Sequence, residues 1–293
     1  MHNKTGMTLP QFLIIGAAKS GTTSLCENLR RHPDCFIPAD KEPNFFGMDE
    51  NYRKGMDYYS TLFEPAEAHQ ICGEGSTDYA KCSRYPHAAE RIAQHLPGIK
   101  LIYIMRHPVE RAYSYYVHRH RHGITETFEE YMERTSEAVD GSHYMMQIDR
   151  YMAHFDKSDF LFLLSTDLID APEKTLAQIC RFIGIDDTFD FANQDYVVAN
   201  RGKQVFEDTL RGRITAPLRK VPLLATAAAA VPQSWRDGVY NLLKKSSYGK
   251  QVRQSYTPPP MQPETRQKLL EYFTEPNDAL AAFIGRDLSS WSS

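Results

Sequence analysis

Cysteine is scarce in this sequence, and no two cysteines stand in a C-x-x-C spacing. The chain has five, an odd number, and they are widely spread: Cys26, Cys35, Cys72, Cys82 and Cys180. A disulfide framework needs an even set of cysteines and an oxidising compartment. We therefore expect free structural thiols and a cytoplasmic protein.

Long hydrophobic runs are also missing. The longest apolar stretch, Val221 to Val231, is too short to span a bilayer as a helix. Met1 to Pro10 is polar and lacks the apolar core of a secretory signal. We therefore expect no transmembrane segment and a soluble protein.

The chain as a whole has no excess of positive charge. Its 34 lysines and arginines stand against 37 aspartates and glutamates, which gives a formal net charge of -3. Proteins that bind nucleic acid without sequence preference depend on a broad basic surface. The sequence therefore predicts no nucleic-acid partner, and any site for an anion must be local.

The sequence does contain an alternation of short apolar runs and helical periodicity. With 293 residues, 42% of them hydrophobic and 24% charged, the chain can bury a sizeable core. Four runs have the length and composition of buried parallel strands: Gln11 to Gly16, Ile71 to Glu74, Leu101 to Met105 and Phe160 to Leu164. Helical spacing follows each run, so we predict a single α/β domain over residues 1–293. Its core would be a parallel sheet of four or five strands flanked by helices.

Helical patterns fill much of the remaining chain. We expect helices over these segments: Thr22 to His32, Thr125 to Phe155, Pro172 to Ile183, Pro263 to Phe273 and Pro276 to Ile284. Residues 203–260 differ because prolines interrupt one or two irregular helices there. We interpret this segment as a helical insertion or lid that helps to form the wall of a substrate pocket.

The most informative motif lies between the first predicted strand and the first predicted helix. It reads Gly16-Ala17-Ala18-Lys19-Ser20-Gly21-Thr22-Thr23-Ser24. A glycine-rich turn at this point directs backbone N–H groups and the positive end of a helix towards an anion. Lys19 adds a positive charge, and several hydroxyl groups add donors. The segment predicts a phosphate cradle, and the alternative is an ordinary turn that caps a helix.

The order of residues in this loop differs from that of nucleotide kinases. In the kinase pattern G-x-x-x-x-G-K-[ST] the lysine follows the last glycine, whereas here Lys19 precedes Gly21. The string resembles the 5′-phosphosulfate loop of sulfotransferases that use 3′-phosphoadenosine-5′-phosphosulfate (PAPS). The resemblance implies a catalytic role for Lys19. It also implies that PAPS is bound by Lys19, Ser20, Gly21, Thr22, Thr23 and Ser24.

A second motif follows a later predicted strand and reads Arg106-His107-Pro108-Val109-Glu110-Arg111-Ala112-Tyr113-Ser114. Pro108 suits a helix start, so Arg106 would lie at the carboxyl edge of the sheet, with Ser114 about two turns into the helix. The string resembles the motif R-x-P-x-x-R-x-x-S, whose arginine and serine bind the 3′-phosphate of PAPS. Arg106 and Ser114 are the predicted 3′-phosphate ligands, although an arginine at a helix start is often a solvated ion-pair partner.

A third motif, Lys41-Glu42-Pro43-Asn44-Phe45-Phe46, resembles the K-E-x-x-F-F segment of glycan-type sulfotransferases. That branch includes the heparan sulfate 3-O- and N-sulfotransferases and soluble bacterial relatives, and its glutamate is the general base. The resemblance makes Glu42 the candidate base that takes the proton of an acceptor hydroxyl. Lys41 and Phe46 are candidate acceptor contacts. The alternatives are a solvated Lys-Glu pair before a turn and, for the base, a histidine.

A fourth motif, Glu74-Gly75-Ser76-Thr77-Asp78-Tyr79, resembles the E-K-[ST]-P-x-Y segment of the same relatives. Gly75 stands where they commonly carry lysine, so the contact of that lysine is absent or is supplied by Lys41 or Lys81. Ser76 and Asp78 are candidate acceptor contacts. Turn-forming roles would explain both residues equally well.

We expect no metal requirement. His118 and His122 are four residues apart, a spacing that can hold a metal on a helix. The interleaved arginines disfavour a cation, and no third ligand is indicated nearby. An acidic magnesium motif is not evident either. The expected co-substrate is PAPS and the expected product is PAP.

Together the motifs predict a PAPS-dependent sulfotransferase that moves a sulfuryl group in line to a hydroxyl, with an amine as the alternative. The acceptor could be a small molecule, a lipid or a glycan, and the oligomeric state is open. Arg201, Lys250 or Arg253 could complete the PAPS site. The rival interpretations are a small-molecule kinase with an altered loop and a nonenzymatic nucleotide-binding protein on the same fold.

Overall fold

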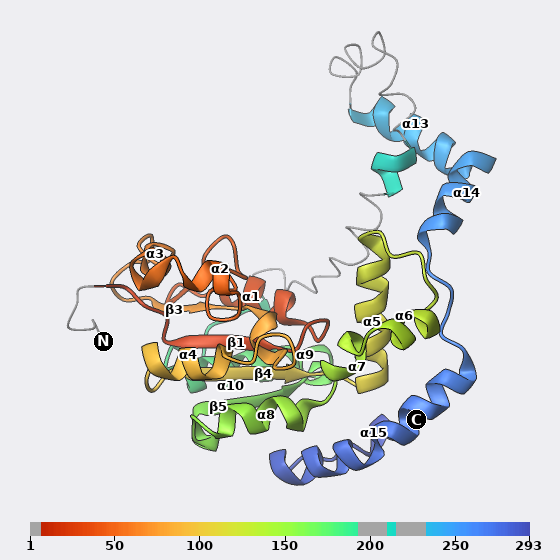
Figure 1. The fold of residues 1–293 in the computed structure, drawn as a ribbon. Helices are drawn as coiled ribbons and strands as arrows, with labels where there is room; N and C mark the ends of the chain where they lie inside the picture. Colours follow the sequence, from red (N-terminus) through yellow and green to blue (C-terminus); the bar gives the residue numbers. More distant parts are fainter. Residues whose placement is uncertain (1–6, 193–209, 215–232) are drawn as a thin grey trace. The chain divides into compact units, whose positions relative to one another are not determined.

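The computed structural model describes residues 7–192, 210–214 and 233–293, and the chain divides into two compact units (Figure 1). The first unit comprises Met1–Tyr115, Met132–Ala199 and Pro263–Ser293, and the second comprises Tyr116–Tyr131 and Asn200–Gln262. The predicted insertion, residues 203–260, belongs to the second unit. Its parts 203–209 and 215–232 lie outside the described residues. The single domain and the lid therefore stay predictions.

A five-stranded sheet forms the centre of the first unit. Its strands are β1 (Phe12–Gly16), β2 (Cys35–Phe36), β3 (Ile71–Glu74), β4 (Lys100–Met105) and β5 (Phe160–Leu164). Their order is β2-β3-β1-β4-β5, and each neighbouring pair is parallel. The predicted parallel sheet is confirmed. The sequence did not predict β2, because its two residues are too few to show a periodicity.

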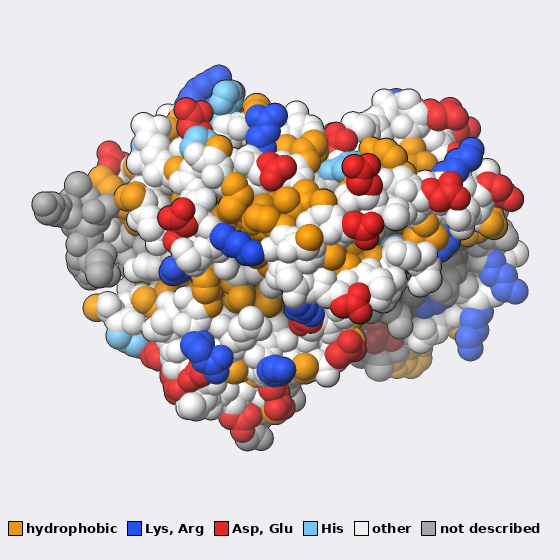
Figure 2. Space-filling model, turned by 90° about the horizontal axis from the view of Figure 1, so that it is seen from below, with side chains coloured by type: hydrophobic (Ala, Val, Ile, Leu, Met, Phe, Trp, Pro, Cys, Tyr) orange, Lys and Arg blue, Asp and Glu red, His pale blue; other side chains and the backbone are white. Residues whose placement is uncertain are grey.

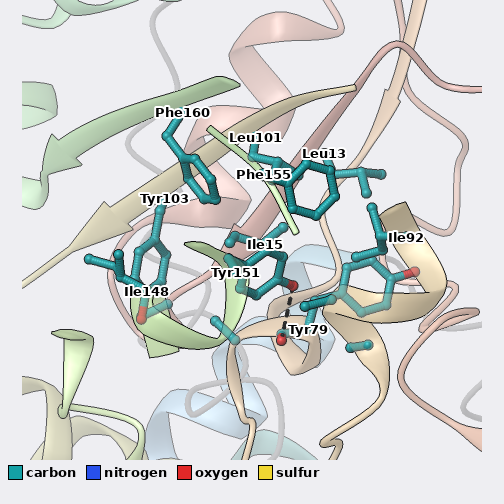
Figure 3. Close-up of a cluster of buried hydrophobic side chains, with 14 of the residues drawn as sticks. Leu13, Ile15, Tyr79, Ile92, Leu101, Tyr103, Ile148, Tyr151, Phe155 and Phe160 are labelled. Atoms are coloured by element: carbon teal, nitrogen blue, oxygen red, sulfur yellow. Dashed lines mark hydrogen bonds between the residues drawn. The ribbon is translucent and has the colours of Figure 1, made fainter. Parts of the chain in front are cut away.

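Alternate residues of the central strands point to opposite faces of the sheet and fill two hydrophobic clusters. On β1, Leu13 joins one cluster and the next residue, Ile14, joins the other. Figure 3 shows part of the first cluster, where the Tyr151 hydroxyl donates a hydrogen bond of 3.1 Å to the carbonyl of Tyr79. Because both faces are apolar, a ligand must reach this sheet at the ends of its strands.

Helices cover both faces of the sheet. The first cluster receives side chains from α4 (Ala88–His95), α8 (Tyr144–Met152) and α15 (Pro263–Ile284). The second receives them from α1 (Thr22–Leu29), α9 (Ser165–Asp170) and α10 (Pro172–Ile183). Further helices are α2 (Asp49–Tyr52), α3 (Gly55–Thr61), α5 (Pro108–Arg121), α6 (Phe128–Arg134), α7 (Glu137–Asp140), α13 (Gln233–Lys245) and α14 (Ser247–Tyr256), and residues 210–214 are also helical. Turns of 3₁₀ helix are η1 (Thr77–Ala80), η2 (Lys157–Asp159) and η4 (Ser289–Ser292).

The helix predictions hold best where proline and glycine mark the ends. Helix α10 has the predicted bounds, with Pro172 in its first turn and Gly184 as a left-handed C-cap. The predicted helical region of residues 125–155 is divided among α6, α7 and α8.

The two predicted C-terminal helices are wrong, since they form the single helix α15 with Pro276 inside it. Leu269, Phe273 and Leu280 lie buried on either side of this proline, and their burial offsets the hydrogen bond that proline removes.

None of the described helices is long and apolar enough to cross a membrane. On the face of the molecule shown in Figure 2, acidic and basic side chains are intermingled and are not separated by sign. This mixed surface agrees with the near balance of charge in the sequence.

Candidate active site

The loop between β1 and α1 has the conformation of a tight strand-to-helix turn. Lys19 and Gly21 adopt left-handed backbone angles, with φ of 73° and 105°. Gly16 has a φ of 155°, and a Cβ there would lie only 2.9 Å from the Cβ of Ala80. Glycine at position 16 is therefore required by the close approach of the η1 segment to the start of the loop.

The start of α1 leaves hydrogen-bond donors for an external acceptor. Gly21 is the N-cap residue, and no side chain of the described residues caps this helix. The Ser20 side chain is 2% exposed, and its Oγ lies beside the Tyr144 hydroxyl. The N–H groups at an uncapped helix start need an acceptor, and a phosphate-type anion supplies one. The predicted cradle residues thus fit a phosphosulfate group.

The second motif lies at the same edge of the sheet, because β4 is the parallel neighbour of β1. The backbone N–H of Ala17 donates a hydrogen bond of 2.7 Å to the carbonyl of Ile104. Arg106 follows the end of β4, and α5 begins at Pro108 as predicted. Ser114 lies on α5 and is half-buried. The structure therefore places Arg106 next to the loop that contains Lys19, with Ser114 further along the helix.

Tyr144 forms hydrogen bonds with both backbone polar groups of Arg106. Its hydroxyl donates a hydrogen bond of 2.6 Å to the carbonyl of Arg106 and accepts one of 3.2 Å from the N–H of the same residue. Tyr144 itself is buried, and burial raises the pKa of its hydroxyl. The Arg106 side chain is 37% exposed, with Nη2 3.9 Å from the Glu110 carboxylate. The backbone is thus fixed while the guanidinium can reach a ligand.

Arg111, the second arginine of this motif, is a buried residue that the sequence analysis did not assign to the site. Its side chain donates hydrogen bonds to Ser142 Oγ at 2.6 Å, to the Ala18 carbonyl at 3.4 Å and to the Ala138 carbonyl. Burial lowers the pKa of this guanidinium. Ala18 lies in the loop between β1 and α1, so Arg111 connects α5 directly to that loop. The fixed spacing of the motif was the only sequence signal for it.

Glu42 and Lys41 form an ion pair at the end of the neighbouring strand β3. Lys41 is 8% exposed, and its Nζ contacts the Glu42 carboxylate and donates a hydrogen bond of 3.4 Å to the Gly75 carbonyl. The other Glu42 oxygen accepts a hydrogen bond of 3.2 Å from Thr77 Oγ1. The Glu42 side chain remains 34% exposed. The pair is therefore only partly exposed, and hydrogen bonds from Lys41 and from Thr77 orient the carboxylate.

Gly75 cannot carry a side chain in this packing. A Cβ there would lie 2.6 Å from the Cys26 sulfur. Of the two lysines considered as substitutes, Lys81 pairs with Asp78 at 2.5 Å, whereas the Lys41 ammonium lies beside both Gly75 and Glu42. The structure thus puts Lys41, and not Lys81, next to the candidate base.

A buried carboxyl group, that of Glu74, forms hydrogen bonds with residues in this part of the site. Glu74 accepts hydrogen bonds from the Tyr79 hydroxyl at 2.6 Å, the Tyr59 hydroxyl at 3.2 Å and the Ser76 N–H at 2.8 Å. Burial raises the pKa of Glu74 to about 7. The sequence signal for it was an acidic residue at the end of an otherwise buried strand.

The remaining predicted acceptor contacts have structural partners. Phe46 is fully buried and packs edge-on against Tyr59 and Tyr79. Ser76 Oγ accepts a hydrogen bond of 2.9 Å from the N–H of Asn44. Asn44 is the residue that the sequence analysis missed here: its buried Oδ1 has no partner among the described residues, two positions from Glu42.

No group of three or more metal-ligating side chains occurs in the ranges that the structure describes. The rings of His118 and His122 lie 4.4 Å apart, and His122 Nδ1 contacts the carbonyl of His118 at 2.8 Å. The absence of a metal requirement stays a prediction.

The fold and this site define an α/β protein of the P-loop-like class, with the features of a phosphate-type anion site where β1 meets α1. Residues 9–211 match the family model described as "Sulfotransferase domain". The chain therefore belongs to the sulfotransferase family, whose activity is the transfer of a sulfuryl group.

Curated relatives and a solved structure agree with this assignment. The chain is 28% identical over 201 residues to "Bifunctional heparan sulfate N-deacetylase/N-sulfotransferase 1" of Caenorhabditis briggsae, a match of 61% of this chain and 23% of that one. It is 30% identical over 190 residues to "Heparan sulfate glucosamine 3-O-sulfotransferase 6" of Homo sapiens, a match of 60% of this chain and 52% of that one. The chain thus spans about a quarter to about half of the length of these relatives.

The solved structure of a sulfotransferase from Alicyclobacillus acidocaldarius covers 98% of this chain and 100% of its own, with 25% identity and a TM-score of 0.66. The predicted resemblance to glycan-type sulfotransferases and their bacterial relatives is confirmed.

Proposed function

We propose that this protein transfers the sulfuryl group of PAPS to a hydroxyl group of its acceptor. One observation carries the proposal: the start of α1 has no side-chain cap among the described residues, and it lies in the loop that contains Lys19 and the buried Ser20 hydroxyl. Arg106 lies at the end of the adjacent strand, where a second phosphate group could be bound. Two anion-binding elements at neighbouring strand ends suit a donor with phosphate groups at both 5′ and 3′ positions.

In this proposal the 5′-phosphosulfate would be held by Lys19, Ser20, Gly21, Thr22, Thr23 and Ser24. The 3′-phosphate would be held by Arg106 and Ser114, with the Arg106 backbone fixed by Tyr144. PAPS, when bound, supplies the sulfuryl group, and PAP is the product. Lys19 and the N–H groups at the start of α1 stabilise the negative charge that develops on the leaving 5′-phosphate.

The Glu42 carboxylate accepts the proton of the acceptor hydroxyl while that oxygen forms its bond to sulfur. Thr77 and Lys41 orient the two carboxylate oxygens. Because the protein forms no covalent bond in this scheme, most of the rate enhancement comes from positioning and from preorganised donors. No step of the scheme needs a metal.

The relatives indicate one candidate class of acceptor. Two curated relatives are named for heparan sulfate, one for N-sulfation and one for 3-O-sulfation. A glycan hydroxyl is therefore one candidate for this chain, beside a lipid or small-molecule hydroxyl and an amine. We propose residues 203–260 as the wall of the acceptor pocket, since this segment lies largely beyond the matched residues 9–211.

Incubation with PAPS labelled in its sulfur and a fractionated extract of the source organism tests the function directly. We expect a labelled product whose identification names the acceptor. Calorimetry adds a test that needs no acceptor: PAP should bind more tightly than AMP, and changing both Arg106→Ala and Ser114→Ala should remove that preference. Magnesium-dependent ATP turnover would instead indicate a kinase. PAP binding without transfer to any acceptor, and without an effect of Glu42 substitution, would indicate a nonenzymatic protein.

A further inference from the structure

Helix α13 exposes a stripe of large apolar side chains. Trp235, Val239 and Leu242 are 72%, 44% and 74% exposed. Their spacing of four and then three residues places them on one face of the helix. We call these three residues the α13 stripe. Scattered single hydrophobic residues are normal at a surface, whereas contiguous exposed apolar residues are often found at interaction sites.

The stripe is separate from the packing that holds the second unit together. Tyr240 and Leu243, on the adjacent side of α13, pack with Leu210 and Ile214 in a hydrophobic cluster. The helix thus already has a buried face, and the stripe adds a second apolar face beside it. The packing of this cluster therefore does not explain why the exposed stripe residues are apolar.

The stretch of sequence that contains the stripe is strongly basic, although the whole chain is not. Residues 200–262 contain eleven lysines and arginines and only three acidic residues, while the chain has a net charge of -3. The acidic residue on α13, Asp237, is ion-paired with Arg211. Lys245, one turn beyond Leu242, is exposed, as is Lys250 on α14. A helix with an apolar stripe and basic residues nearby in the sequence has the composition of helices that lie in a membrane interface.

We propose that the α13 stripe binds the surface of an anionic lipid bilayer, with α13 lying in the interface plane. Trp235 and Leu242 would enter the boundary between headgroups and acyl chains, while the lysines would contact the anionic headgroups. The helix has 13 residues and is about 20 Å long, too short to span the bilayer, so the contact is peripheral.

The charges favour a lipid surface over two other occupants. A second copy of this chain would bring its own basic segment against the first, and like charges would oppose the contact. A polyanionic glycan would satisfy the lysines but would leave the apolar stripe without a partner. An anionic bilayer offers both an apolar layer and negative charge.

The two tryptophans of the chain provide a direct probe, because Trp235 is exposed whereas Trp291 is 5% exposed. Vesicles of phosphatidylcholine with phosphatidylglycerol should shift the tryptophan emission to shorter wavelength and protect it from acrylamide. The shift should be absent in Trp235→Phe. The protein should bind vesicles of phosphatidylcholine alone more weakly than the anionic vesicles. Added salt should weaken its binding to the anionic vesicles.

Co-sedimentation with the same vesicles measures the contribution of the stripe. The variant with Trp235→Ser, Val239→Ser and Leu242→Ser should bind the vesicles at least about tenfold more weakly than the unchanged protein. Lys245→Glu with Lys250→Glu should lower binding only to the anionic vesicles. The matched control is Ile169→Ser, which removes an equally exposed apolar side chain, 72% exposed, from the first unit. It should bind as the unchanged protein does, and circular dichroism should show that all variants fold.

Three results would overturn the proposal. The first is equal vesicle binding by the unchanged protein and the triple-serine variant. The second is a concentration-dependent dimer that this variant abolishes, without vesicle binding, which would assign the stripe to a second copy. The third is retention on heparin that the lysine changes weaken, without vesicle binding, which would assign the basic segment to a glycan.

Discussion

The guanidinium of Arg111 donates a hydrogen bond of 3.4 Å to the carbonyl of Ala18, and this contact joins helix α5 to the loop between β1 and α1. The same side chain also binds Ser142 and Ala138. The two segments proposed to bind the two ends of PAPS are therefore connected through one buried cation. A shift of either segment would be transmitted to the other through this residue.

Replacing this arginine tests the connection. Arg111→Met should destabilise the protein by about 3 to 5 kcal/mol in a denaturant titration, because it leaves buried acceptors without donors. Arg111→Lys keeps the charge but cannot contact all three acceptors, so it should weaken PAP binding even in protein that remains folded. The control Arg84→Lys changes an ion pair whose arginine is 54% exposed and should have an effect of under about 1 kcal/mol. Normal PAP affinity in Arg111→Lys would contradict the positioning role.

Tyr144→Phe removes both hydrogen bonds that hold the Arg106 backbone. We expect PAP affinity to fall by about tenfold, the equivalent of about 1.4 kcal/mol, while AMP affinity changes little, since AMP lacks the 3′-phosphate. Calorimetry with both ligands measures the difference. Tyr58→Phe, at a tyrosine that is 40% exposed, is the control. An equal loss for both ligands would show that Tyr144 supports only the fold.

Lys19→Ala should reduce turnover more than it weakens PAP binding. The ammonium is proposed to stabilise charge that develops only as the 5′-phosphate leaves, and one such contact is worth about 10² to 10³ in rate. The measurement is kcat at saturating PAPS beside PAP affinity by calorimetry. An unchanged kcat would remove Lys19 from the catalytic step.

Glu74 gives the folded state a defined pH dependence. Its pKa is raised by burial from 4.5 to about 7, so the folded state holds this proton more tightly than the unfolded chain does. Its contribution to stability is complete below about pH 4.5 and is lost as the pH rises to about 7, a change of about 3 kcal/mol. Glu74→Gln should flatten the free energy of unfolding over this range. Glu67→Gln, at a side chain that is 75% exposed, should leave the slope unchanged. An unchanged slope in Glu74→Gln would contradict the assignment.

The sequence correctly predicted the helices and strands that are marked by residues within or next to them. Strand β3 and helix α10 have the expected bounds, because apolar runs, proline and glycine mark them directly. The loop around Lys19 was also predicted, since glycine at a strand-to-helix junction has few other uses.

The sequence could not predict contacts between distant residues. Arg111 meets Ser142 across 31 positions and Tyr144 meets Arg106 across 38, and no periodicity encodes such pairs. The unbroken helix through Pro276 depends on tertiary burial in the same way. Asn44 was missed because its unpartnered oxygen becomes visible only once its surroundings are known.

The most direct test of the central claim is the transfer of labelled sulfur from PAPS by the unchanged protein and by Glu42→Gln, measured on the same acceptor. The amide keeps the shape of the side chain but cannot accept the proton of the hydroxyl. We predict normal PAP binding and transfer that is about 10² to 10⁴ slower in the variant. Near-normal transfer by Glu42→Gln would contradict the account and would move the base to another residue, such as a histidine or Asp78.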